Sequence, residues 1–455
     1  MTDFNNFLWP GRKGHLVGIG GVSMSSLAEV LFGMGILITG SDMNESKNVQ
    51  DLRALGIPVH TGHAASNLAP DVEFVVRTAA VHDENPEIME ARRRKIPVFE
   101  RTQAWGAISR DYANALCISG THGKTTTTSM CTHILMAADR DPTVMIGGTL
   151  PLLNAGHRVG HGDTIIMEAC EYYNSFLSFY PTVAVILNIE ADHLDFFKDL
   201  EDVERSFHRF AERVPMNGWV VANADDENTM KTLADVHRKI VTFGLQNKAD
   251  VTARNIEFRG ANSHFDVIYK GRKFTDVTLH VPGMHNVKNA LAATAAAICL
   301  GIRPTAVKYG LAGFNGAGRR FEFKGKYNGA DVYDDYAHHP GELKVLLDTV
   351  ENLNYTRTIV VFQPHTYSRT AALFDDFVKQ LRRPDLLVLA EIYAAREKNT
   401  IGISSAALAE QVEGSIFCPT AQELEEKLRE IARPGDIILT VGAGDVYKIG
   451  EALVR

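Results

Sequence analysis

A glycine- and threonine-rich loop at residues 118–128 constrains the fold of this chain more than any other segment. It reads I-S-G-T-H-G-K-T-T-T-T and follows an apolar run at 115–118 that is typical of a buried strand. A strand, a glycine turn and a helix start in this order bring bare backbone N–H groups, the positive end of a helix and the charge of Lys124 around one point. Phosphate groups bind at such points. The sequence therefore predicts a shortened phosphate-binding loop and a nucleoside triphosphate site.

Length and composition narrow the class of protein. A chain of 455 residues is too long for a single hydrophobic core, and typical domain sizes predict about three domains. The net charge of -8 and the pI near 6.1 disfavour the broad basic surface that binds nucleic acids or anionic membranes. Residues 1–15 lack the pattern of an export signal, and the most apolar stretch, 290–300, is too short to span a bilayer. We therefore expect a cytoplasmic protein with no nucleic-acid or membrane partner, whose oligomeric state stays open.

Apolar, strand-like runs alternate with helical stretches along the chain, which is typical of parallel sheets with crossover helices. This rhythm restarts before the phosphate loop, and the glycine-rich run at 310–320 is typical of a hinge or linker. We therefore predict an α/β protein of three domains. They are a Rossmann-like unit at 1–108, a central P-loop-type ATPase with a mainly parallel sheet at 109–314, and a Rossmann-like unit at 315–455.

The first unit opens with a second glycine turn. Gly18, Gly20 and Gly21 follow an apolar strand, and Asp42 follows the next strand about twenty residues later. This is the layout of a dinucleotide-type site, in which the acidic residue meets a sugar or a base. Ser23 stands where the usual fingerprint has its last glycine. The pattern predicts a bound nucleotide, and a nicotinamide-dependent oxidoreductase remains a remote alternative.

Acidic groups follow two strands downstream of the phosphate loop. Glu168 ends one strand, and His193 comes after the acidic run that ends the next. Because the carboxyl ends of neighbouring parallel strands share one edge, we expect these groups to converge on the phosphates. Oxygen ligands suit magnesium, so Glu168 and Thr125 are candidates for one Mg²⁺ ion and His193 for a second. The structural alternative is that these residues are solvated strand ends and helix caps.

Two further polar clusters lie later in the chain. His285, Asn286 and Asn289 open an alanine-rich helix, where amides can read an adenine edge or cap the helix. Polar runs at 334–339 and 363–369 follow two strands of the last unit. The adjacent histidines in the first run cannot easily face one metal ion, so hydrogen-bonding roles are expected there.

Taken together, these motifs resemble those of the Mur ligases, the ATP-dependent amide-forming enzymes that build the peptidoglycan precursor. The opening G-I-G-G-V-S-M-S-S-L-A, followed by G-S-D, is most similar to the members that add L-alanine to UDP-N-acetylmuramate. The resemblance covers essentially the whole chain. The other runs occur in the family's order: G-T-H-G-K-T-T-T, E-A-C-E, N-I-E-A-D-H-L-D, G-M-H-N-V-K-N, G-R-R-F-E, D-D-Y-A-H-H-P and Q-P-H-T-Y-S-R-T.

The resemblance implies a role for each candidate site residue. The ATP phosphates would be bound by Gly120, Thr121, His122, Gly123, Lys124, Thr125 and Thr126, and the rest of ATP by His285, Asn286, Asn289, Arg320 and Asp335. Two Mg²⁺ ions would be bound by Thr125, Glu168 and His193. The sugar nucleotide would be bound by Gly18, Gly20, Gly21, Met24, Ser25, Asp42, His122 and Glu171, and the amino acid by Tyr336 and Arg369. The catalytic residues would be Lys124, His193, Glu168 and Arg369.

The implied reaction joins L-alanine to the lactyl carboxylate of UDP-N-acetylmuramate through an acyl phosphate. Some relatives have an arginine where Thr366 stands, which leaves the contacts of the amino-acid carboxylate open. The helix expected at 203–214 contains no lysine, which favours the alanine-adding branch. The nearest alternative is a recycling ligase that attaches the murein tripeptide to the same sugar nucleotide. An ATP-binding regulatory protein without turnover is disfavoured by the intact metal and amino-acid motifs.

Overall fold

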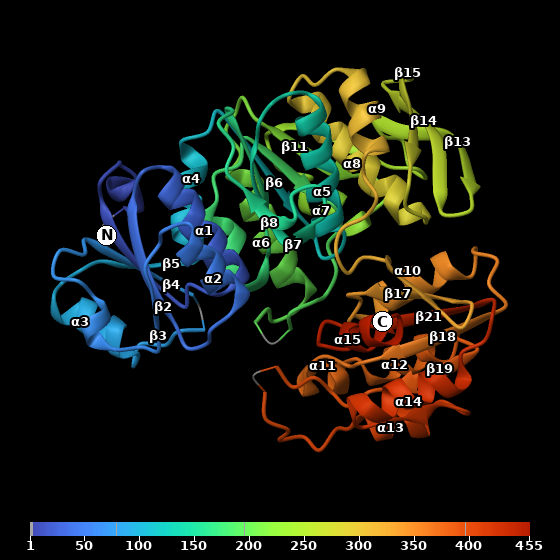
Figure 1. The fold of residues 1–455 in the computed structure, drawn as a ribbon. Coiled ribbons are helices and arrows are strands. Elements are labelled where there is room, and N and C mark those ends of the chain that lie inside the picture. Colours follow the sequence, from blue (N-terminus) through green and yellow to red (C-terminus); the bar gives the residue numbers. More distant parts are fainter. Residues whose placement is uncertain (1–2, 79, 195, 396) are drawn as a thin grey trace. The chain divides into compact units, whose positions relative to one another are not determined.

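The computed structural model describes residues 3–78, 80–194, 196–395 and 397–455. Asp195, the last residue of the N-I-E-A-D-H-L-D run, lies outside these ranges. Helices alternate with the strands of three sheets that follow one another along the chain (Figure 1). The predicted α/β fold is therefore confirmed.

The chain forms two compact units. The first contains most of the first two sheets, and the second contains the third sheet together with residues 258–263 and 280–286. The three domain boundaries expected from the sequence stay a prediction.

The first sheet is parallel and has the strand order β3-β2-β1-β4-β5. Its carboxyl edge therefore carries the residues that follow each strand, including the glycine turn after β1. Its strands are β1 (Lys13–Val17), β2 (Leu37–Asp42), β3 (Val59–Thr61), β4 (Phe74–Arg77) and β5 (Val98–Glu100). The helices around it are η1 (Phe4–Phe7), α1 (Val22–Gly33), α2 (Lys47–Ala54), η2 (Ala65–Asn67), α3 (Pro86–Arg93) and α4 (Arg101–Arg110).

A buried carboxylate ties the elements of this first sheet together. Glu87, in the first turn of α3, is 0% exposed and accepts hydrogen bonds from Ser41 Oγ (2.6 Å) and Asn67 Nδ2 (2.5 Å). Burial alone would raise the pKa of Glu87, but these donors and the nearby ring of His15 outweigh it and lower the pKa to about 2. The charged carboxylate thus connects β1, β2 and α3.

The second sheet has ten strands in the order β15-β14-β13-β12-β11-β10-β6-β9-β7-β8. Its centre, β11-β10-β6-β9-β7, is parallel, and the β7–β8 hairpin at one edge is antiparallel. The strands are β6 (Asn114–Ser119), β7 (Thr143–Leu150), β8 (Ala155–Arg158), β9 (Thr164–Glu168), β10 (Val183–Ile186), β11 (Trp219–Asn223), β12 (Lys239–Phe243), β13 (Val251–Arg259), β14 (Asn262–Tyr269) and β15 (Arg272–Leu279). The helices are α5 (Lys124–Ala137), η3 (Tyr172–Ser178), α6 (Leu200–Glu212), α7 (Glu227–Thr232), α8 (Met284–Cys299) and α9 (Pro304–Ala312).

The predicted linker at 310–320 begins later than expected, because α9 continues to Ala312. Gly310 lies against the backbone of α5, where an added Cβ would come within 2.5 Å of Ile134 Cα. The glycine therefore permits two helices to pack closely, and this part of the run is not a hinge.

One hydrophobic cluster runs through both sheets of the first unit. It includes Phe74 on β4 of the first sheet, Trp105 on α4, Phe176 on η3 and Ile186 on β10 of the second sheet. A polar contact adds to this packing, since His157 Nε2 on β8 lies 2.7 Å from Glu29 Oε2 on α1. The first two sheets consequently share one core.

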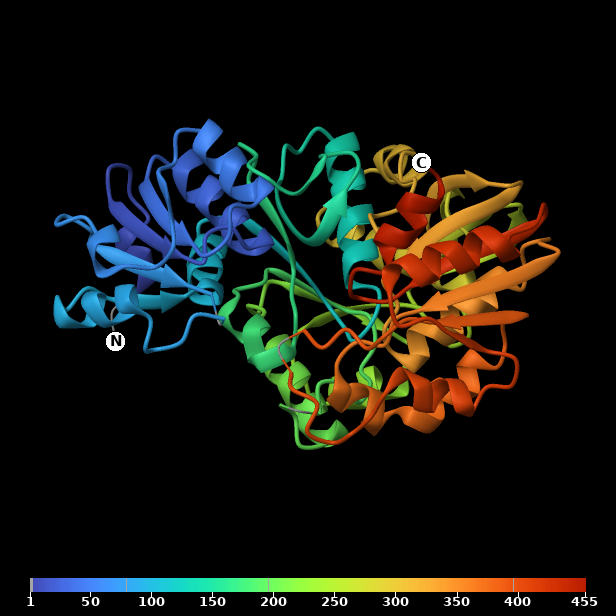
Figure 2. The same cartoon turned by 60° about the horizontal axis from the view of Figure 1, so that its bottom comes forward.

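The third sheet has the order β16-β17-β21-β18-β19-β20, and only its edge pair β16–β17 is antiparallel. Helices cover both of its faces (Figure 2), each over its own hydrophobic cluster. Its strands are β16 (Glu322–Tyr327), β17 (Ala330–Asp335), β18 (Arg357–Phe362), β19 (Leu386–Leu389), β20 (Ile416–Phe417) and β21 (Asp436–Val441). Its helices are α10 (Pro340–Val350), α11 (Tyr367–Ala372), α12 (Phe374–Leu381), α13 (Ser405–Glu410), α14 (Ala421–Ile431) and α15 (Tyr447–Leu453).

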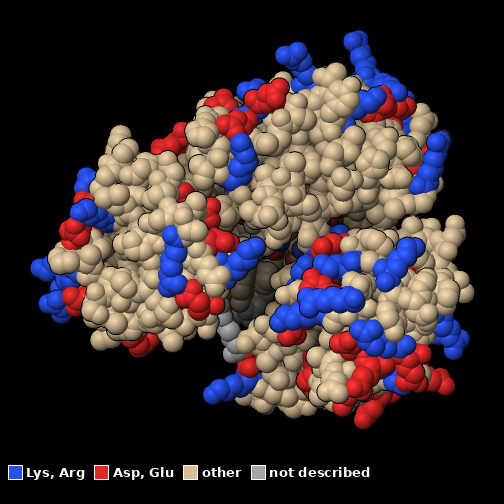
Figure 3. Space-filling model, viewed as in Figure 1, with Lys and Arg blue, Asp and Glu red and all other residues tan. Residues whose placement is uncertain are grey.

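Two short helices, α11 and α12, follow β18 with a break at Leu373. Asp375 and Asp376 then lie in the first turn of α12, where acidic side chains stabilise a helix start. Among the described residues, no helix has the length and apolar character needed to cross a membrane. On the face drawn in Figure 3, basic and acidic side chains are interspersed.

Candidate active site

The predicted phosphate loop connects β6 to α5 at the centre of the second sheet. Gly120 has a φ of 138° and Gly123, the N-cap of α5, has a φ of 85°. An added Cβ on Gly120 would meet Leu187 Cβ at 2.9 Å, and one on Gly123 would meet Asn289 Oδ1 at 2.8 Å. Both glycines are therefore required by the backbone conformation and by close neighbours.

Asn188, which follows β10, holds the loop in place. Its side chain accepts from His122 N (2.8 Å) and donates to His122 O (3.1 Å), and its carbonyl accepts from Thr121 N (3.1 Å). Asn188 was not among the site residues predicted from the sequence. Its position just after a strand of the same sheet could have identified it as a site residue.

Lys124 of the loop is paired with Glu171, the N-cap of η3. Its Nζ lies 3.1 Å from Glu171 Oε2 and also donates to the carbonyls of Gly120 and Thr121. Burial lowers the pKa of Lys124, but the carboxylates of Glu171 and Glu168 and the nearby Cys170 raise it above its usual value overall. The lysine is therefore a fixed positive charge within the loop.

Glu168 ends β9 beside the start of the loop, because β9 pairs with β6 and Glu168 lies opposite Ile118. Its Oε2 accepts a hydrogen bond from Gly147 N on β7 at 2.8 Å. Thr125 is buried in the first turn of α5. The sheet thus brings the carboxylate of Glu168 to the edge at which the loop begins, as predicted from strand order.

His193 lies beside Glu171, whose Oε1 is 4.0 Å from His193 Nε2. The ring stacks on Tyr172 with centroids 4.2 Å apart, and the backbone has a φ of 54°. His193 therefore shares a neighbour with Lys124, which strand order alone does not reveal.

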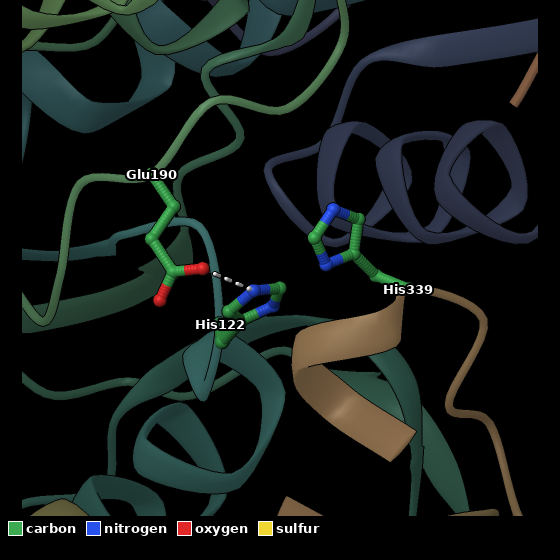
Figure 4. Close-up of side chains that lie close together, drawn as sticks. All are labelled: His122, Glu190 and His339. Carbon is green, nitrogen blue, oxygen red and sulfur yellow. Dashed lines mark ion pairs between the residues drawn. The ribbon is translucent and has the colours of Figure 1, made fainter. Parts of the chain in front are cut away.

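Figure 4 shows His122 and Glu190 projecting toward each other from the loop and from the segment after β10. His122 Nε2 lies 3.4 Å from Glu190 Oε2. His339, also drawn in Figure 4, belongs to the second unit, where its Nδ1 accepts from Gly341 N and caps α10. The hydrogen-bonding role predicted for this histidine fits that cap.

The donor set around the loop suits magnesium. Thr125 and Glu168 offer hard oxygen atoms, and Glu168 reaches the loop edge from the neighbouring strand. His193 is a softer ligand, held by its stack on Tyr172. The residues present therefore fit a Mg²⁺ ion at this edge of the sheet.

The glycine turn after β1 is closed by Asp42. Asp42 Oδ2 accepts from Gly20 N at 2.9 Å, and an added Cβ on Gly18 would meet Thr78 Cγ2 at 2.7 Å. Gly21 caps α1, and Ser25 donates its hydroxyl to Val22 O (2.9 Å) within that helix. Asp42 and Ser25 thus also have structural partners of their own.

A cavity of about 390 Å³ is lined by residues of both sheets of the first unit. Gly21 and Met24 line it from α1, and Glu168 lines it from β9. Arg101, at the start of α4, also lines it and was missed by the sequence analysis. It follows β5 directly, so the rule that sites gather at strand ends could have found it.

The predicted adenine-site residues fall on the start of α8. Asn289 belongs to the first unit and lies against Gly123 of the loop. His285 and Asn286 cluster with the second unit, where Asn286 Nδ2 donates to Pro282 O at 2.7 Å. Burial lowers the pKa of His285 to about 4, so that this ring is neutral at pH 7.

The second unit contains Asp335 and Tyr336 after β17. Asp335 accepts from Phe321 N and Ala337 N, both at 2.8 Å, and burial raises its pKa to about 6 despite the nearby Arg320. The guanidinium of Arg320 lies 5.2 Å from the centroid of the Tyr336 ring. Asp335 therefore shapes the loop that presents Tyr336 and Arg320.

Arg319 and Arg369 have different environments in this unit. Arg319 donates to Asp334 Oδ2 (2.9 Å) and to the carbonyl of Gly444 (3.0 Å), so it holds the β17 and β21 ends together. Arg369 lies on the short helix α11, and its Nη1 is 3.2 Å from His365 Nδ1. Thr366, the N-cap of α11, has a φ of 66°.

Three domain families match this chain in order. Residues 13–113 match the Mur ligase family catalytic domain, residues 118–297 the Mur ligase middle domain, and residues 319–444 the Mur ligase glutamate ligase domain. The chain belongs to the Mur ligase family. The family resemblance predicted from the sequence motifs is thus confirmed.

Individual Mur ligases are similar to this one over most of its length. A UDP-N-acetylmuramate–L-alanine ligase from Clostridium novyi is 45% identical, over 99% of both chains. The crystal structure of a UDP-N-acetylmuramate–alanine ligase from Thermotoga maritima has a TM-score of 0.81 and 30% identity, covering 97% of this Mur ligase and 98% of that chain. A UDP-N-acetylmuramate:L-alanyl-γ-D-glutamyl-meso-diaminopimelate ligase from Neisseria meningitides has a TM-score of 0.62 and 27% identity, covering 68% of this chain and 100% of that one.

Proposed function

We propose that this Mur ligase uses ATP to join L-alanine to the lactyl carboxylate of UDP-N-acetylmuramate, a step of peptidoglycan precursor synthesis. The observation that carries the proposal is the 45% identity, over 99% of both chains, to the ligase of that name from Clostridium novyi. The tripeptide-adding structure is less similar, at 27% identity over 68% of this chain. Because the chain belongs to a ligase family, the alternative of a nicotinamide-dependent oxidoreductase is no longer needed to explain its first glycine turn.

The proposed chemistry has two steps. The lactyl carboxylate attacks the γ-phosphate of ATP, which releases ADP and leaves an acyl phosphate. The amine of L-alanine then attacks the acyl carbon, and inorganic phosphate leaves. No protein nucleophile is needed, so catalysis consists of positioning the reactants and neutralising their charges.

The phosphate loop supplies that neutralisation. An anion must approach another anion, and Lys124 is a fixed positive charge within the loop. The N–H groups at the start of α5 add the positive end of a helix. The proposed ATP ligands here are Gly120, Thr121, His122, Gly123, Lys124, Thr125, Thr126 and Asn289.

Thr125, Glu168 and His193 are the proposed residues for two Mg²⁺ ions. Mg²⁺ would supply further neutralisation of the phosphate charge. The position of Glu168 beside the loop start supports this role, and Glu168 also lines the cavity of the first unit. Glu171, paired with Lys124, keeps its proposed place on the substrate side.

The cavity is the proposed site of the sugar nucleotide. Gly21 and Met24 line it together with Glu168, so it extends from the glycine turn to the edge of the phosphate loop. A ligand held at the glycine turn can therefore direct its carboxylate toward the phosphates. The other proposed contributors are Gly18, Gly20, Ser25, Asp42 and His122.

The second unit is proposed to bind the amino acid and part of ATP. Tyr336 and Arg369 are the amino-acid candidates, and Arg320, Asp335, His285 and Asn286 the nucleotide candidates. A guanidinium can bind a carboxylate with two parallel hydrogen bonds, which favours Arg369 for the carboxylate of L-alanine. A cytoplasmic location is proposed as well, since both ATP and the sugar nucleotide are required.

Phosphate release measured with ATP, Mg²⁺ and UDP-N-acetylmuramate tests the proposal. L-alanine, L-serine, glycine and the murein tripeptide are compared as amines. We expect release only when both the sugar nucleotide and L-alanine are present. Preference for the tripeptide would assign the recycling reaction instead, and release that ignores the sugar nucleotide would overturn the ligase assignment.

A further inference from the structure

Arg101 is a partly buried cation on the wall of the first unit's cavity. Among the residues that the structure describes, its guanidinium forms no hydrogen bond or ion pair. A guanidinium has five N–H donors, and leaving them unsatisfied away from water costs free energy. Contacts within the described part of the protein therefore do not explain why this cation lies on the cavity wall.

The acidic groups nearest to Arg101 have other partners. Glu100 accepts a hydrogen bond from Arg77 Nε at 2.8 Å, and Glu168 accepts one from Gly147 N. Glu100 therefore attracts Arg101 only at a distance, and among the residues that the structure describes Arg101 has no direct ion-pair partner.

The position of Arg101 in the fold increases the free-energy cost of its positive charge. Arg101 is the first residue of α4, a helix of ten residues, and the N-terminus of a helix repels cations. Partial burial also lowers its pKa. An anionic ligand in the cavity would offset both penalties, whereas a neutral ligand could accept hydrogen bonds but would not balance the charge.

We propose that Arg101 binds an anionic oxygen group of the sugar nucleotide, either the diphosphate or the lactyl carboxylate. This inference rests on the proposed function and deepens it, by adding a specificity residue to the glycine turn. Both groups are planar or tetrahedral oxyanions that a guanidinium binds with two hydrogen bonds. The lining of the cavity includes Gly21 of the glycine turn and Glu168 beside the start of the phosphate loop, as well as Arg101.

Binding measured by calorimetry without ATP separates the two anions. UDP-N-acetylmuramate carries both groups, whereas UDP-N-acetylglucosamine carries only the diphosphate. We expect Arg101→Gln to weaken binding of UDP-N-acetylmuramate by roughly 10- to 100-fold, the range for a hydrogen bond to a charged group. An equal loss with UDP-N-acetylglucosamine assigns Arg101 to the diphosphate, and a loss confined to UDP-N-acetylmuramate assigns it to the carboxylate. Unchanged affinity for both overturns the inference.

Thermal melting distinguishes binding from a structural role. Because Arg101 has no direct partner among the described residues, the ligand-free Arg101→Gln protein should melt at the same temperature as the native protein or higher, while its stabilisation by UDP-N-acetylmuramate falls. A lower melting temperature with unchanged affinity would show a structural arginine and contradict the inference. Arg101→Lys keeps the charge but loses the paired N–H donors of the guanidinium, so it should lose less affinity than Arg101→Gln. If the glutamine variant does not fold, the lysine variant takes its place in the test.

Two controls complete the test. Arg93→Gln removes an exposed arginine of α3 that pairs with Glu90, and it should leave every affinity unchanged. ADP affinity should be the same in Arg101→Gln as in the native protein. If the native protein itself does not bind UDP-N-acetylmuramate, the proposed function fails; if it binds and the variant binds equally well, only the assignment of Arg101 fails.

Discussion

Lys124 Nζ lies 3.1 Å from Glu171 Oε2, and the two side chains are only 14% and 2% exposed. The charge that should stabilise the transferring phosphate is therefore already held in place by the carboxylate of Glu171. Such preorganisation lowers the cost of reorganising the site during the reaction.

Replacing Lys124 should abolish most of the activity. Lys124→Met removes the fixed charge within the loop, and we expect phosphate release to fall by about 100- to 1000-fold, as when a single transition-state donor is removed. The measurement is the release assay with saturating L-alanine. Lys308→Met, which removes an exposed lysine paired with Asp276, is the control and should keep the native rate. A native rate in Lys124→Met would contradict the proposed mechanism.

Glu171→Gln should destabilise the ligand-free protein. The buried ammonium of Lys124 would keep its two carbonyl partners but lose its charged partner, and breaking one side of a buried ion pair costs about 3 kcal/mol. Urea unfolding at pH 7 measures this loss. Glu201→Gln, at a side chain 75% exposed, should change the free energy of unfolding by less than about 1 kcal/mol. Equal effects of the two substitutions would show that the Lys124–Glu171 pair contributes no more to the free energy of unfolding than an exposed ion pair does.

Glu87→Gln should produce a pH-dependent loss of stability. The pKa of Glu87 is lowered from 4.5 to about 2 in the folded protein, so its charged form stabilises the fold above pH 4.5. That contribution disappears as the pH falls from 4.5 toward 2. We expect the variant to lose up to about 3 kcal/mol at pH 7, and progressively less below pH 4.5.

Urea unfolding at pH 7, 5, 4 and 3 measures this difference for Glu87. The exposed Glu84 lies three residues earlier, and Glu84→Gln is the matched control with little expected effect at any pH. A loss for Glu87→Gln that stayed constant over this range would show packing, not charge, as its cause.

Arg369→Ala should affect L-alanine more than the other substrates. Without the guanidinium on α11, we expect the KM for L-alanine to rise by roughly 10- to 100-fold, because a charge-assisted bidentate contact is lost. Calorimetric affinity for UDP-N-acetylmuramate should stay unchanged. Arg429→Ala, in the same unit and paired with Glu425, should behave like the native protein. A native KM for L-alanine in Arg369→Ala would remove this residue from the amino-acid site.

The phosphate loop could be predicted from the sequence because its signals are local. An apolar strand, glycines at Gly120 and Gly123, and Lys124 are adjacent in the chain, and the backbone conformation at each glycine follows from its neighbours. The position of Glu168 followed from strand order, since parallel strands share their carboxyl edge. These predictions depended on few long-range contacts.

The partners of the site residues could not be predicted in the same way. The pairing of Glu171 with Lys124, and the use of Asp42 by Gly20, depend on how separate loops pack. Arg101 directly follows β5, which is a local signal, but its lack of a hydrogen-bond partner among the described residues depends on packing and could not be predicted. Gly310 was taken for part of a linker because its role is close packing against α5.

The first two sheets share one hydrophobic cluster. The chain should therefore unfold in fewer cooperative units than its three sheets would suggest. Phe74, Trp105 and Ile186 belong to one cluster, whereas the third sheet has clusters of its own. Calorimetric heating should therefore give two transitions and not three. UDP-N-acetylmuramate added alone should delay only one of them, since every residue around its proposed cavity lies in the first unit. An isolated fragment ending near residue 108 would expose Trp105 to water and should aggregate instead of folding.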